Sequence, residues 1–240
     1  MMTRESMRSS LFFSFSIALA LLAFAALFLG MFQLALVLPG ADEGWWVHLL
    51  FIVVFWTYVA AGLFAWWRRP SNRMGALIVV GGFAVFAGSL SNTGVPVLTA
   101  LGTMTATAVL AVLIHLLHAF PSGRLRSAAS RTTVAAGYFV ALVLQMPLYI
   151  FDPGAPATLF IADRPDLLAT GVVVQRVAGF AVAFATTAIL VRRLIRSDRA
   201  HRRVLGPVFG YGMLAVVIIP ASVGLERRSG CRRWRGPACR

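Results

Sequence analysis

The sequence predicts an all-α integral membrane protein, a polytopic bundle of about seven transmembrane helices with a cytoplasmic N-terminus. Hydrophobic residues make up 59% of the chain and charged residues 12%, about half of the roughly 25% charged residues of a soluble domain. The mean hydropathy is +0.82. So few charges cannot cover a surface that faces water, whereas a bilayer requires none along its core.

Long apolar segments recur along the chain, each near the roughly 20 residues that a helix needs to cross about 30 Å of hydrocarbon. Because lipid offers the backbone no hydrogen-bond partners, we predict that each is helical. In the second segment, Trp45 and Trp46 begin and Trp66 and Trp67 end the apolar run, which is typical of aromatic belts at the two faces of a membrane. The predicted spans are 11–38, 46–67, 74–92, 95–120, 133–151, 167–191 and 204–225.

The charges indicate topology. The net charge of +14 comes from arginine, because the chain has no lysine. The arginines cluster in alternate loops between the spans, a pattern that follows the positive-inside rule rather than nucleic-acid binding. We therefore divide the chain into a cytoplasmic segment 1–10, a membrane domain 11–225 and an arginine-rich tail 226–240, and expect a multi-pass protein of the cell membrane with the lipid bilayer as its partner.

The tail conflicts with this alternation. After seven spans it is expected outside, yet it carries six arginines together with Cys231 and Cys239. Two explanations stay open: the seventh span does not fully cross, or the tail is sequence translated out of frame. The two cysteines match no metal-binding spacing and are expected to be incidental.

Few residues within the spans suggest chemistry. Arg176 lies inside the sixth span, and a charge there is a functional hypothesis by default. Its position about 24 Å from Arg192 along a helix instead favours a side chain that reaches the outer interface. Gln145, followed by Pro147, is expected to kink the fifth span and to join helices. His115 and His118 share one helix face and are expected to be interfacial histidines with polar neighbours.

Several function classes are disfavoured. A retinal protein needs a lysine for its Schiff base, and the chain has none. No Asp or Glu falls inside a predicted span, which argues against proton-coupled or cation-coupled transport. We find no nucleotide-binding loop, metal motif or nucleophile motif. The sequence therefore predicts no catalytic residue, cofactor or metal.

Two short stretches carry a resemblance. WWRRPSNRMGALIVVGG spans 66–82 and HLLHAFPSGRLRS spans 115–127. Together they resemble the membrane sensor region of actinobacterial two-component sensor histidine kinases, and the likeness extends over most of 50–225. The matching positions have a physical role, since prolines end helices, glycine permits a turn and arginines anchor the cytoplasmic face. These positions are Arg68, Arg69, Pro70, Asn72, Gly75, His115, Pro121, Ser122, Gly123 and Arg124.

The resemblance implies a signal-input and anchoring region, a homodimer, and a cytoplasmic response regulator as partner if a full-length kinase exists. The kinase and dimerisation domains of that family have no counterpart in these residues, so no kinase activity carries over, and we expect a truncated or frameshifted gene product. A small stand-alone transporter is the alternative, and a membrane-embedded enzyme is disfavoured by the missing catalytic constellations.

Overall fold

In the computed structural model, which describes residues 4–40, 45–196, 210 and 212, the chain forms helices and no strand is found among these residues. Six helical segments in this part are long and apolar enough to cross a membrane. They match the first six predicted spans within a few residues. The seventh predicted span, His201 and the tail lie outside the described residues, except that Gly210 and Gly212 are helical.

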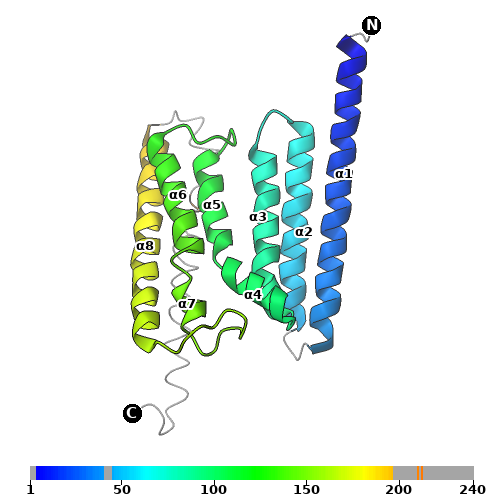
Figure 1. Cartoon of the computed structure of the whole chain (residues 1–240). Coiled ribbons are helices and arrows are strands. Elements are labelled where there is room, and N and C mark those ends of the chain that lie inside the picture. Colours follow the sequence, from blue (N-terminus) through cyan, green and yellow to red (C-terminus); the bar gives the residue numbers. More distant parts are fainter. Residues whose placement is uncertain (1–3, 41–44, 197–209, 211, 213–240) are drawn as a thin grey trace.

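The first three spans form one side of the bundle (Figure 1). They are α1 (Arg4–Val37), continued by η1 (Leu38–Gly40), then α2 (Trp45–Arg68), and α3 (Met74–Ser89) continued by η2 (Leu90–Asn92). The first helix begins at Arg4, inside the segment predicted to precede the membrane domain. A core of Leu19, Ala26, Phe55, Val59, Leu63 and Val79 joins these three helices.

The other three spans form the second side. The fourth span is divided into α4 (Pro96–Thr105) and α5 (Ala108–Ala119), and the fifth into α6 (Ala128–Leu142) and α7 (Pro147–Ile150). The sixth span is the single helix α8 (Pro165–Ile195). Their core consists of Ile114, Leu117, Val134, Val182, Ala183 and Leu190.

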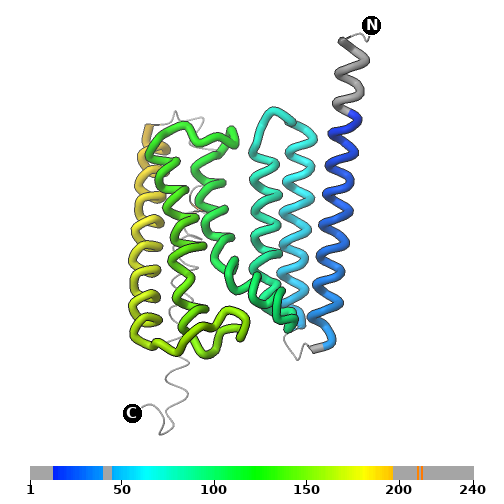
Figure 2. The backbone as a smooth tube through the Cα atoms, viewed as in Figure 1, coloured from blue at the N-terminus to red at the C-terminus, as the bar shows by residue number. Residues whose placement is uncertain are grey.

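Sequential spans lie side by side and alternate in direction, and α3 against α5 joins the two halves. The tube in Figure 2 shows the chain reversing at each end of the bundle, with α4 running obliquely at the end opposite the N-terminus. Large apolar side chains such as Phe24 and Phe184 are exposed on the outside of the bundle. This inverted distribution is what lipid, rather than water, accommodates.

Candidate functional site

The two stretches that carry the resemblance meet at one end of the bundle. Asn72, in the turn between α2 and α3, donates a hydrogen bond from Nδ2 to the carbonyl of Pro121, in the turn between α5 and α6, at 3.1 Å. Its Oδ1 accepts from the backbone N–H of Met74 at 3.0 Å. One side chain therefore both begins α3 and joins it to a turn far away in sequence. We call this contact the docked turns.

Gly123 completes the docked turns. Its φ is +71°, a conformation that side chains with a Cβ rarely adopt. A Cβ at this position would lie 2.9 Å from the Cα of Arg73 and 2.6 Å from its carbonyl carbon. Only glycine therefore satisfies both the backbone angle and the close approach. The adjacent Phe120–Pro121 peptide bond is cis.

Gly75 has a different role from Gly123, because it joins two helices. It faces Gly62 of α2, and a Cβ on Gly75 would lie 2.7 Å from both the carbonyl oxygen of Gly62 and the Cα of Trp66. Small residues allow such backbone contact between membrane helices. The α2–α3 hairpin is thus packed backbone to backbone just inside the docked turns.

The arginines gather at the same end as the docked turns. Arg68 and Arg69 end α2, and the guanidinium of Arg68 lies 5.3 Å from the centre of the Phe64 ring. Pro70 is exposed in the same turn, and Ser122 and Arg124 belong to the other turn. In residues 45–196 the acidic side chains are at the opposite end of the bundle. This separation matches the predicted topology, with the arginine-rich end on the cytoplasmic side. The arginines of this end are Arg68, Arg69, Arg73, Arg124, Arg126, Arg131, Arg192, Arg193 and Arg196.

A buried histidine lies just below the docked turns. His118 is 3% exposed, and its Nδ1 is 3.1 Å from the Ser130 hydroxyl of α6. Its Nε2 is 3.4 Å from the hydroxyl of Thr186 in α8, a side chain with no exposed surface. Arg193 donates to the His118 carbonyl at 3.4 Å. We call His118, Ser130 and Thr186 the histidine clasp, because it joins α5, α6 and α8.

The histidines thus have the polar neighbours that the sequence predicted, but His118 is more deeply enclosed than an interfacial residue. His115 lies one turn earlier with Nδ1 3.3 Å from the Tyr138 hydroxyl. The described residues contain no group of three or more side chains placed to hold a metal ion.

Gln145 occupies the gap between α6 and α7 and is 5% exposed. Its Nε2 donates to the Thr103 carbonyl at 2.6 Å, and its Oε1 accepts from the hydroxyl of Thr107. Thr107 also donates to the Ala141 carbonyl at 3.0 Å. Both interruptions, α4–α5 and α6–α7, are therefore joined by one amide, which satisfies backbone groups that lipid would leave unpaired.

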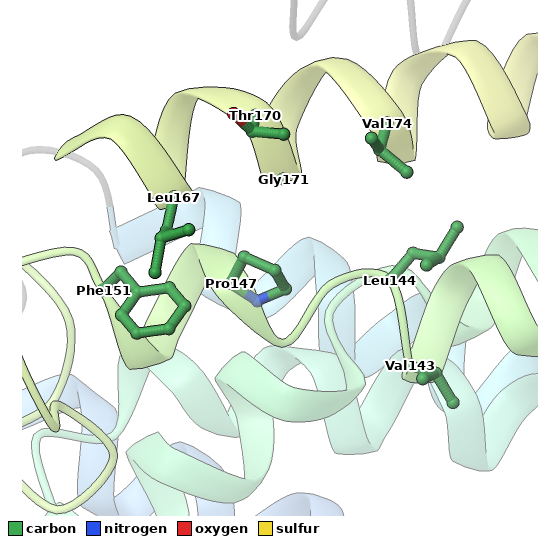
Figure 3. Close-up of a pocket in the computed structure, with 8 residues that line it drawn as sticks. All are labelled: Val143, Leu144, Pro147, Phe151, Leu167, Thr170, Gly171 and Val174. Carbon is green, nitrogen blue, oxygen red and sulfur yellow. The ribbon is translucent and has the colours of Figure 1, made fainter. Parts of the chain in front are cut away.

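A cavity of about 270 Å³ lies beside this gap, between the α6–α7 region and the first half of α8 (Figure 3). Within it, Gly171 meets the ring of Pro147 closely, since a Cβ on Gly171 would lie 2.8 Å from Cγ of the proline. Thr170 is the one hydroxyl-bearing side chain among the lining residues, so the cavity is apolar. It is lined by Val143, Leu144, Pro147, Phe151, Leu167, Thr170, Gly171 and Val174.

Arg176 is separate from these features. It is exposed on α8, on the face that also exposes Val173, Val177 and Phe180. Neither the histidine clasp nor the cavity includes it. The sequence hypothesis of a buried functional charge therefore finds no site at this position, while a side chain that reaches the outer interface remains the prediction.

The sequence also missed two polar contacts. Thr186 and Ser130 gave no signal, because single hydroxyl residues are common in membrane helices. Gln33 of α1 is buried and donates to the Ser89 hydroxyl at 2.8 Å, and Ser89 in turn donates to the Phe86 carbonyl at 2.8 Å. A glutamine in an otherwise apolar span was the signal that could have revealed the second contact.

The fold and these contacts define the class of protein: a multi-pass α-helical integral membrane protein whose polar side chains join its helices. Comparison with protein-family models, with curated proteins and with solved structures found no match to the chain.

Proposed function

We propose that this chain is a membrane signal-input region of the two-component sensor histidine kinase type. The observation that supports the proposal is the contact between the two stretches that resemble that family. Asn72 and Gly123 have specific tasks in the docked turns, a side-chain hydrogen bond and a positive φ. Residues that a resemblance picks out separately thus belong to one contact at the end of the bundle where a cytoplasmic output is expected.

The helices offer a route for a signal. α8 runs without interruption over 31 residues from the acidic end to the arginine-rich end. The histidine clasp fastens its last turns to α5 and α6, beside the docked turns. A change in packing at the outer half, where α6 and α7 are interrupted, can therefore move α8 as a rigid unit. A homodimer and a cytoplasmic response regulator are the partners that this role implies.

The direct test is the DNA that follows the coding sequence, translated in all three frames. We expect a dimerisation sequence with a phosphorylatable histidine, followed by an ATP-binding domain. Unrelated genes in every frame would contradict the proposal. The purified 240-residue chain is expected to incorporate no phosphate from labelled ATP, and incorporation would contradict the assignment of this chain to signal input alone.

A small stand-alone transporter is the second proposal, and the interrupted spans favour it. Discontinuous helices that meet near mid-membrane form the binding sites of many transporters, and Gln145 joins two such interruptions here. Thr107→Cys, with Cys231 and Cys239 replaced by serine, separates the two proposals. Labelling of this cysteine by membrane-impermeant reagents from both sides favours transport, and protection from both sides favours signal input.

A further inference from the structure

The docked turns place two arginines side by side. Gly123 packs on the backbone of Arg73, with 2.9 Å between the position of a Cβ on the glycine and the Cα of the arginine. Arg124 follows Gly123 directly in the chain. Both side chains are exposed. The fold therefore fixes the bases of two guanidinium side chains next to each other, although they are distant in sequence.

Nothing acidic in residues 45–196 offsets this pair, because Asp152, Asp163 and Asp166 belong to the opposite end of the bundle. Arg73 is also the residue that precedes the first turn of α3. The positive end of the helix dipole lies there and disfavours a cation. Two like charges in this position are unfavourable unless an anion lies between them.

The membrane supplies such an anion at this depth. Trp67 and Phe64 end the apolar part of α2, and Arg68 lies against both rings. Aromatic residues in this position mark the level of the lipid headgroups, and the docked turns follow within a few residues. Arginine binds phosphate through two parallel N–H donors, and the cytoplasmic leaflet carries the anionic lipids.

We propose that Arg73 and Arg124 form a binding site for the headgroup phosphate of an anionic phospholipid in the cytoplasmic leaflet. The lipid neutralises the pair and holds the two turns together from the membrane side. This site goes beyond the proposed role in signalling, and does not depend on it, since a transporter with the same docked turns would bind the same lipid.

The test uses the full chain purified in dodecyl maltoside and titrated with phosphatidylglycerol or phosphatidylcholine, with bound lipid counted by native mass spectrometry. We expect tighter binding of phosphatidylglycerol. The variant Arg73→Gln/Arg124→Gln should weaken that binding about 30-fold, which is about 2 kcal/mol at about 1 kcal/mol per arginine near the surface. Each single variant should weaken it about fivefold, so the site remains testable if the double variant does not fold.

The matched control is Arg68→Gln/Arg196→Gln. It removes the same charge from the same end, but α2 and α8 lie on opposite sides of the bundle (Figure 1). We expect the control to change binding less than threefold. Equal loss in both double variants would overturn the site in favour of general surface charge, and equal binding of the two lipids would overturn it as well. Displacement of the lipid by millimolar glycerol phosphate would assign the site to a soluble anion and overturn the lipid proposal.

Discussion

The α2–α3 hairpin gives the sharpest prediction, because two glycines of α3 differ only in what surrounds them. Gly75 and Gly81 are both buried. A Cβ on Gly75 would lie 2.7 Å from the Cα of Trp66, whereas a Cβ on Gly81 would first meet Cδ1 of Tyr58 at 3.4 Å. The variants Gly75→Ala and Gly81→Ala therefore add the same methyl group to the same helix, once against backbone and once into ordinary contact.

The magnitude follows from this difference. Ordinary van der Waals contact begins at 3.4 Å, so α2 and α3 must separate by about 3.4 − 2.7 = 0.7 Å at Gly75, and no side-chain rotation relieves the clash. Overpacking of this kind costs about 1–3 kcal/mol. The gain in helix propensity on replacing glycine by alanine, up to about 1 kcal/mol, applies to both variants and cancels. We expect Gly75→Ala to be less stable than Gly81→Ala by about 1–3 kcal/mol.

The assay is unfolding of the purified full chain from mixed micelles by sodium dodecyl sulfate, followed by circular dichroism at 222 nm. Gly81→Ala should unfold at the same detergent fraction as the parent chain or a higher one, and Gly75→Ala at a lower one. If both variants unfold at the same fraction, backbone contact between α2 and α3 does not contribute as argued.

Two further variants test the polar contacts by the same unfolding assay. Gln145→Leu leaves the Thr103 carbonyl without its donor and should destabilise by about 1–2 kcal/mol, since hydrogen bonds between membrane helices contribute about 0.6 and at most 1.7 kcal/mol each; Gln175→Leu, on the exposed half of α8, should have no effect, and similar losses in the two would contradict the role of the amide. His118→Phe removes both contacts of the histidine clasp and should cost about 1–2 kcal/mol, whereas His48→Phe at the far end of α2 should be neutral. A stable His118→Phe variant would show that packing alone holds α5 to α8.

Hydrophobic length predicts the six described spans because a bilayer imposes the same thickness on every helix. The break in the fifth span was also predicted, since Gln145 and Pro147 supply an amide and a missing backbone donor. The break in the fourth span was not. Residues 101–110 read LGTMTATAVL, which is apolar enough for a continuous helix. The interruption at Ala106 and Thr107 depends on Thr107 bonding to Ala141 and Gln145, and such contacts between distant segments leave no local pattern.

The site was predicted unevenly for the same reason. The motif residues of the docked turns were named individually, but nothing in their spacing indicates that Asn72 bonds to Pro121. The histidine clasp depends on which faces of α5, α6 and α8 meet, and the spans are too uniformly apolar to reveal their faces. Apolar moments that orient a helix in a soluble protein vanish when both lipid and protein are apolar.

This uniformity explains why the informative residues of the chain are in its turns. A lipid-facing position such as Phe184 is served equally by many apolar side chains, so the spans constrain hydrophobicity more than identity. A turn has to end one helix, begin the next and meet its neighbour within a few residues. Gly123 has no substitute in that geometry, and Asn72 satisfies two partners at once. Exchange of Asn72 or Gly123 should therefore disturb helix packing more than exchange of any single exposed residue in the spans, and a signal that alters packing has its most sensitive point at the same contact.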